Sequence, residues 1–202
     1  FPNKAVGALI LRLLVGQALA VTIGAADTVM VSSVGEAAVS GISLVDTINI
    51  LLINIFTALA TGGAVVSSQF LGKQDLERAR RAAKQLIVAI TALALIITVI
   101  SLAFRPHILR LVFGQIEDDV MENAKTYFLL TALSYPFLAL YNGGAALFRS
   151  MGNSKISMLT SLVMNIVNIC GNAILIFIFN MGVAGAGTAT LASRNIGAAI
   201  MM

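Results

Sequence analysis

The stretch QLIVAITALALIITVISLAF, residues 85–104, decides the fold, because it places 20 residues in a row without a charge. A helix needs about 20 apolar residues to cross the roughly 30 Å hydrocarbon core of a bilayer. Lys84 precedes this stretch and Arg105 follows it. The stretch therefore predicts a membrane-spanning helix with a charge at each end.

The composition of the whole chain agrees with a membrane protein. Of 202 residues, 58% are hydrophobic and 11% are charged, whereas roughly 25% are charged in a soluble domain. Five of the basic residues behind the net charge of +4 fall within 73–84, which is typical of a loop between spans and argues against a nucleic-acid surface. One cysteine and one histidine exclude an intramolecular disulfide and a Cys/His metal site. No ATP-binding phosphate loop occurs in the sequence, and we expect no enzyme activity and no cofactor.

Uncharged runs recur along the chain and set the number of helices. They cover 47–72, 126–148 and 156–193, the last interrupted by a turn at Asn180. We expect an all-α, polytopic membrane protein with helices at about 5–33, 37–70, 82–104, 122–148, 156–179 and 184–202, the sixth truncated. Because the sequence opens at Phe1 and ends in an apolar run, we also expect residues 1–202 to be part of a longer protein.

Basic residues in the short loops predict the orientation. The loop after the second helix holds the cluster at 73–84, and the loop after the fourth holds Arg149 and Lys155. Such loops face the cytoplasm. The loop after the third helix is rich in acidic residues and is expected outside, so the N-terminus is expected inside.

Two carboxylates fall within the expected spans. Asp27 lies some eight residues before the turn at Gly35 and Asp46 some ten after it, so both are about 12 to 15 Å deep at 1.5 Å per residue. A charge at the centre of a membrane helix costs at least about 2.5 to 3.5 kcal/mol. Asp27, with no cation beside it in sequence, is therefore expected to bind a cation or take up a proton. Asp46 can also be read as lying nearer the outer interface.

A third polar group comes from the fifth helix. Asn165, Asn168 and Asn172 share one helical face, because they are spaced i, i+3 and i+7. Asn172 lies about eight residues from the turn at Asn180, at the depth of the two carboxylates. These side chains predict an interior cavity. The simpler alternative is that the asparagines only bond between helices.

The second and fourth helices add further candidates. Asp46 and Asn49 share a face of the second helix. Pro136, which follows Tyr135, should bend the fourth helix, and Tyr141 lies about one and a half turns further on. Either tyrosine can line a pocket or only pack. The candidates for a substrate cavity are Asp46, Asn49, Tyr135, Tyr141 and Asn165.

Five short stretches, taken in order, carry a family resemblance. They are ADTVMVS at 26–32, ATGG through SQFLG at 60–72, FRSMGN at 148–153, NIVNICGN at 165–172 and GVAGAGTAT at 182–190. With the expected helix count, the chain resembles the N-terminal six-helix lobe of the multidrug and toxic compound extrusion (MATE) family.

The resemblance implies a twelve-helix antiporter, with a C-terminal lobe absent from this chain. Such proteins export organic, often cationic, compounds or drugs while protons or sodium ions enter. The family's cation site maps onto Asp27, Asn168, Asn172 and Thr190, with a backbone carbonyl from Ala186. Asn172 stands where the family commonly has Asp. Asp46 could restore that charge, or coupling could use protons at Asp27 alone.

The implied mechanism is mutually exclusive occupancy by ion and cargo, with two lobes giving alternating access in a prokaryotic cell membrane. One alternative is a lipid-linked precursor flippase of the same superfamily, for which Arg194 is the main candidate cation in the cavity. Another is a non-transporting membrane protein. The substrate and the coupling ion stay open.

Overall fold

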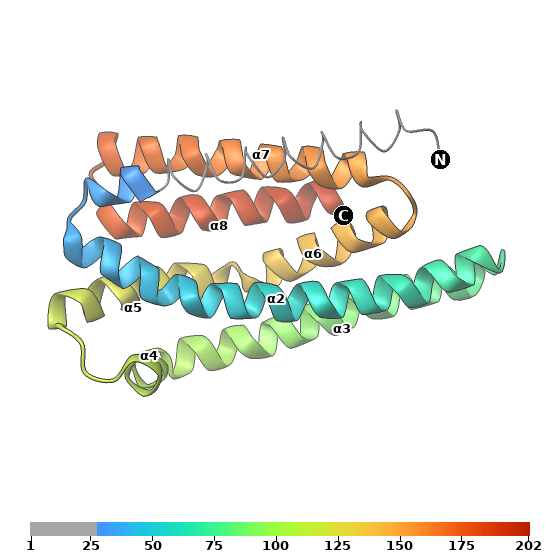
Figure 1. Cartoon of the computed structure of the whole chain (residues 1–202), viewed down its shortest axis with the longest axis horizontal. Coiled ribbons are helices and arrows are strands. Elements are labelled where there is room, and N and C mark those ends of the chain that lie inside the picture. The colour runs from blue at the N-terminus through green and yellow to red at the C-terminus, as the bar shows by residue number, and fades with distance from the viewer. Residues whose placement is uncertain (1–27) are drawn as a thin grey trace, which may run out of the picture.

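A computed structural model describes residues 28–202, and every regular element in this range is a helix (Figure 1). Asp27 and most of the expected first helix, 5–33, lie outside the described residues. Residues 28–32 are helical and lead through a turn into α2. The elements that follow are α2 Glu36–Gly72, α3 Leu76–Ala103, α4 Arg105–Phe113, α5 Asp118–Leu133, α6 Tyr135–Ser150, α7 Ser154–Asn172, the π-helix η1 Ala173–Ile178 and α8 Gly182–Met201.

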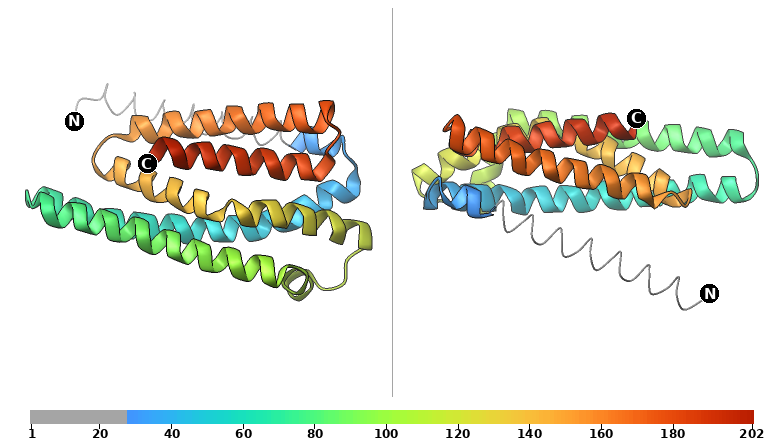
Figure 2. Two further views of the ribbon diagram at one scale, coloured as in Figure 1. Left: turned by 180° about the vertical axis from the view of Figure 1, so that it is seen from behind. Right: turned by 90° about the horizontal axis from the view of Figure 1, so that it is seen from above.

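The two longest helices form a hairpin that projects beyond the rest of the bundle (Figures 1 and 2). At 1.5 Å per residue, the 37 residues of α2 and the 28 of α3 measure about 55 and 42 Å. Both exceed the roughly 30 Å of bilayer hydrocarbon. The tip of the hairpin therefore carries its charges outside the apolar layer.

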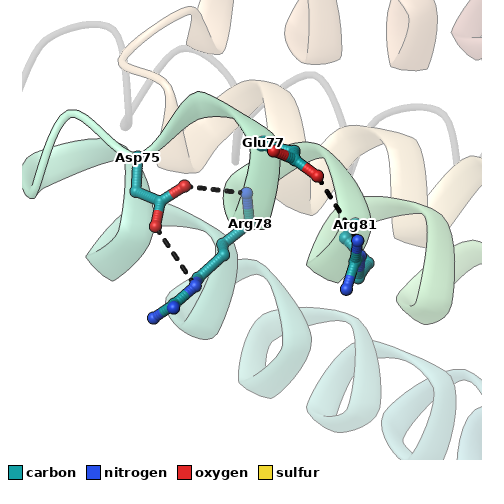
Figure 3. A network of polar contacts seen from close by, with 4 residues as sticks. All are labelled: Asp75, Glu77, Arg78 and Arg81. Atoms are coloured by element: carbon teal, nitrogen blue, oxygen red, sulfur yellow. Dashed lines mark hydrogen bonds and ion pairs between the residues drawn. The ribbon is translucent and has the colours of Figure 1, made fainter.

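α3 begins at Leu76, ahead of the predicted residue 82, because Asp75 caps it. The Asp75 carboxylate accepts a hydrogen bond from the Arg78 backbone N–H at 3.0 Å and pairs with Arg78 Nε at 3.3 Å (Figure 3). Glu77 and Arg81 pair at 3.4 Å one turn further on. These exposed pairs add little stability, but the cap fixes where the helix starts.

The fourth helix, expected over 122–148, is divided at Ser134 into α5 and α6. Pro136 has no N–H, so it cannot bond to the Ala132 carbonyl one turn earlier. Thr98 Oγ1 of α3 lies 3.2 Å from that carbonyl and shares its proton between it and the Ala94 carbonyl, which is 2.8 Å away. The predicted bend is thus present, and a hydroxyl from a neighbouring helix partly replaces the hydrogen bond that Pro136 cannot make.

The core lies where α2, α3, α5 and α6 meet. Large side chains of this core that are no more than 1% exposed are Val45, Phe56, Ile90, Phe128 and Tyr135, with Leu109 added from α4. The opposite face of α3 exposes large apolar side chains, among them Val88, Leu95, Ile96 and Val99. An exposed apolar face of this kind suits contact with lipid.

Three helical segments between residues 28 and 202 are long and apolar enough to cross a membrane: Glu36–Gly72, Leu76–Ala103 and Ser154–Ile178. α5 and α6 have 16 residues each, which is short for a span. They follow one another along the bundle, so together they cover the length that one span needs (Figure 1).

The two ends of the bundle differ in charge. The tip of the α2–α3 hairpin and the connection from α6 to α7 lie toward the same end (Figures 1 and 2). The basic residues of these two connections are Lys73, Arg78, Arg80, Arg81, Lys84, Arg149 and Lys155. The short helix α4, which the sequence did not predict, and the acidic start of α5 lie at the opposite end.

Candidate functional site

A chain of hydrogen bonds joins α7 to α8. Asn172 Nδ2 donates to Asn168 Oδ1 at 3.4 Å, and Asn168 Nδ2 donates to Thr190 Oγ1 at 3.3 Å. Thr190 Oγ1 donates to the Ala186 carbonyl at 3.0 Å. The structure thus brings together four of the five residues onto which the family's cation site maps. The fifth, Asp27, lies outside the described residues.

Small residues let these helices approach closely enough for the amide chain to form. A Cβ atom at Gly171 of α7 would lie 2.9 Å from the Cβ of Ala189 of α8. On another face of α8, a Cβ atom at Gly187 would lie 2.7 Å from Leu130 Cδ1 of α5. Both contacts are too short for a larger residue without a shift. Directly after Asn172 the α-helix gives way to the π-helix η1, a departure that is frequent at functional sites.

A cavity of about 290 Å³ lies beside this chain of amides. It collects side chains from the end of the first helix, from α2, α5, α7 and α8. Its lining is Thr28, Val31, Val39, Ile42, Ser43, Asp46, Tyr127, Asn172, Ala186 and Thr190. Within the described residues, Asp46 is the one charged side chain of this lining. The described part of the lining therefore presents hydroxyl and amide groups beside the carboxylate of Asp46.

Asp46 also begins a second polar chain, which leads away from the cavity. Asn49 Nδ2 donates to Asp46 Oδ1 at 3.1 Å, and the Tyr135 hydroxyl donates to Asn49 Oδ1 at 3.0 Å. Asn49 is 3% exposed and Tyr135 is fully buried. Of these three candidates for the substrate cavity, Asp46 lines it, whereas Asn49 and Tyr135 link α2 to α6.

The remaining candidates, Asn165 and Tyr141, are half-buried on α7 and α6 and belong to neither polar chain. Arg194, which the sequence placed only loosely, contacts the break between α5 and α6. Its Nη1 donates to Ser134 Oγ at 2.7 Å, and Ser134 Oγ donates to the Thr131 carbonyl at 2.6 Å. Arg194 therefore does not line the cavity beside Asp46.

Sequence reasoning missed Tyr127, Thr28 and Ser43, all of which line the cavity. A depth count could have found Tyr127. It lies nine residues from the start of α5 at Asp118, or about 13 Å, which is the depth of Asp46. The two serine and threonine hydroxyls carry no comparable signal, because such residues are common in membrane helices.

Comparison with known proteins places this architecture. The MatE family model matches residues 13–174. The uncharacterized transporter YisQ of Bacillus subtilis (strain 168) is 32% identical over 184 residues, which is 89% of this chain and 40% of that protein. The multidrug export protein MepA of Staphylococcus aureus (strain MW2) is 27% identical over 191 residues, 94% of this chain and 42% of MepA.

The fold agrees with the sequence matches. A solved outward-facing conformation of a multidrug resistance MATE family transporter of the MOP superfamily has a TM-score of 0.88 and 22% sequence identity, covering 99% of this chain and 44% of that one. The architecture is that of one lobe of an all-α, polytopic membrane protein, as predicted. The chain belongs to the MATE family, which confirms the resemblance in the sequence. It spans about 40% of the length of the curated relatives it matches.

Proposed function

We propose that the chain is one lobe of a secondary antiporter that exports organic, often cationic, compounds in exchange for protons or sodium ions. Membership of the MATE family supports this function, as does the similarity to a multidrug export protein. Because the chain spans about 40% of its curated relatives, we infer that a second lobe completes the transporter.

The observation that carries the proposal is the cavity between the helices. A carboxylate, an amide and hydroxyl groups from distant parts of the sequence meet there in an otherwise apolar bundle. Buried polar groups of this kind in a membrane protein are costly and mark ion or substrate pathways. A flippase for a pyrophosphate lipid would need several cations in the cavity, whereas the described part of the lining carries a carboxylate.

Asp27 is the proposed coupling residue, acting with Asn168, Asn172 and Thr190 and with the Ala186 carbonyl. When Asp27 carries a proton or a bound ion, the first helix adopts a packing arrangement that does not accept cargo. When Asp27 is free of both, the protein favours the conformation that accepts cargo. Ion and cargo are then bound alternately, and the two lobes open the central cavity to one side at a time.

The charge distribution supports an orientation. Basic residues gather at the end that carries the α2–α3 tip, and this end is the cytoplasmic one by the rule that short cytoplasmic loops are rich in Lys and Arg. The N-terminus is then cytoplasmic, in a prokaryotic cell membrane.

Expression of the full-length protein in bacteria that lack their own exporters tests the function. Cells that carry it should accumulate less of a fluorescent organic cation than cells with an empty vector. An ionophore that collapses the ion gradients should remove the difference. Equal accumulation with and without the protein, at confirmed expression in the membrane, would overturn the proposal.

A further inference from the structure

We propose that Asp46 on α2 is a direct ligand of a monovalent alkali cation such as Na⁺, in a site that it shares with Asn172 and Thr190 across the cavity. That Na⁺ drives export rests on the proposed function. That Na⁺ binds at Asp46 is a separate claim. It adds a ligand from the second helix to a site that the resemblance draws from the first, fifth and sixth helices.

The charge of the Asp46 carboxylate favours a bound cation. Asp46 lines a cavity inside a bundle with an apolar surface, and an ionised carboxylate there needs a counter-charge. The ion pairs between described residues are the exposed pairs Asp75–Arg78 and Glu77–Arg81 at the hairpin tip, so neither involves Asp46. Na⁺, one of the two ions of the proposed function, can supply this counter-charge from the cavity that Asp46 lines.

The side chains around Asp46 offer oxygen atoms as ligands. Hard cations bind oxygen, and the side chains around Asp46 supply it from several helices. Ser43 lies one turn before Asp46 on α2, Thr190 comes from α8, and Thr28 from the end of the first helix; all three carry hydroxyl groups and line the cavity. Asn172 adds an amide on α7. No single helix could offer this set.

The Asp46 carboxylate has acceptor positions beyond those that its neighbours use. Asp46 Oδ1 accepts a hydrogen bond from Asn49 Nδ2 at 3.1 Å, and Tyr127 of α5 interacts with the same carboxylate. An ionised carboxylate has about four acceptor positions, so these contacts leave positions for an ion. They also fix the orientation of Asp46, which lowers the entropic cost of binding.

Among the described residues, Arg194 of α8 attracts the Asp46 carboxylate electrostatically. Arg194 does not occupy the ion's place, because its Nη1 bonds to Ser134 at 2.7 Å and it is absent from the cavity lining. A small ion can approach Asp46 from the cavity that its side chain lines. The cavity of about 290 Å³ also has room for several waters of about 30 Å³ each, so the ion keeps part of its hydration.

Direct Na⁺ binding to the purified full-length protein tests the site. Saturable binding of radioactive ²²Na⁺ should be present in the wild type. It should weaken at least about tenfold in Asp46→Asn, because the substitution removes the formal charge from the described lining. Asp75→Asn is the matched control, since it removes an exposed carboxylate and Asn caps a helix as well as Asp does. Its affinity should equal that of the wild type.

Asp46→Asn keeps an oxygen for Asn49 and Tyr127, so we expect it to fold, and its melting temperature and elution volume check this. If it does not fold, Ser43→Ala replaces it, because Ser43 is exposed to the cavity. Ser43→Ala should weaken Na⁺ binding several-fold with an unchanged melting temperature. Unchanged affinity in the folded Asp46 variant, unchanged affinity in Ser43→Ala, or no saturable binding to the wild type would each overturn the inference.

The site and the transport function fail in different ways. If Na⁺ binds through Asp46 but no organic compound is exported, the proposed function fails and the site stands. If export is intact and Na⁺ affinity does not depend on Asp46, the function stands and the site is wrong.

Discussion

Arg194 Nη1 on α8 donates a hydrogen bond of 2.7 Å to Ser134 Oγ, at the residue where α5 ends and α6 begins. Ser134 in turn donates to the Thr131 carbonyl at 2.6 Å. The guanidinium of Arg194 thus links α8 to the break between α5 and α6. A charged donor makes such a bond stronger than a neutral pair would.

Arg194 and Ser134 should therefore be energetically coupled. We expect Arg194→Gln and Ser134→Ala each to lower the melting temperature of the full-length protein in detergent. In the double variant the two losses should overlap, with a coupling energy of about 1.5 to 3 kcal/mol, typical of a hydrogen bond to a charged group. Strictly additive losses would show that the two residues stabilise the protein independently.

The Tyr135 hydroxyl should stabilise the protein, whereas that of Tyr141 should not. Tyr135→Phe leaves the buried Asn49 Oδ1 without its donor at 3.0 Å, which costs about 1 to 3 kcal/mol. Tyr141, half-buried on the same helix, is the matched control, and Tyr141→Phe should stay within about 0.5 kcal/mol of the wild type. Chemical unfolding of both variants makes the comparison, and equal losses would contradict the bond from α2 to α6.

The bond from Thr98 to the Ala132 carbonyl should matter because of Pro136. Thr98→Val removes the hydroxyl that lies 3.2 Å from the Ala132 carbonyl and 2.8 Å from the Ala94 carbonyl, and it should cost about 1 kcal/mol. In a Pro136→Ala background the new backbone N–H can bond to Ala132, so the same Thr98 substitution should cost less. Thermal unfolding of the four proteins measures this difference. An equal cost of Thr98→Val in both backgrounds would show that the Thr98 hydroxyl does not replace the hydrogen bond that Pro136 cannot make.

Much of the fold could be predicted from the sequence, because helix length and charge-free runs follow directly from the thickness of a bilayer. The depth count likewise placed Asn172 and Asp46 in one layer, and the structure puts both on one cavity. The boundary expected at about residue 82 came from the uncharged run, whereas α3 begins at Leu76, where Asp75 caps it. The charged segment 73–84 thus includes the first turns of the third helix, as its amphipathic pattern indicates.

The rest of the site depends on how each helix is rotated about its axis, which packing decides and a single sequence does not show. Tyr127 and Tyr135 lie on one span, yet Tyr127 faces the cavity and Tyr135 is buried against Asn49. The break at Ser134 separates them. The contact of Arg194 with Ser134 could not be predicted either, because the two residues lie far apart in the sequence and on different helices.

Two glycines of α2 should respond in opposite ways to alanine. A Cβ at Gly41 would lie 2.9 Å from the backbone N of Ala124 and 3.0 Å from the backbone O of Val120, whereas nothing lies within 4 Å at Gly62. Gly41→Ala should therefore destabilise the protein by about 1 to 3 kcal/mol. Gly62→Ala should stabilise it by about 0.5 to 1 kcal/mol through helix propensity. Melting temperatures of the two variants test this, and a stabilised Gly41→Ala would contradict the close packing of α2 on α5.

The most direct test of the central claim, ion-coupled export through the first-helix carboxylate, uses the full-length protein in proteoliposomes. Efflux of a fluorescent organic cation is measured with an imposed proton gradient and, separately, with a sodium gradient, for the wild type, Asp27→Asn and the control Asp75→Asn. At least one gradient should drive efflux in the wild type and in Asp75→Asn, and neither should drive it in Asp27→Asn. Efflux that persists undiminished in Asp27→Asn, or no response of the wild type to either gradient, would contradict the account.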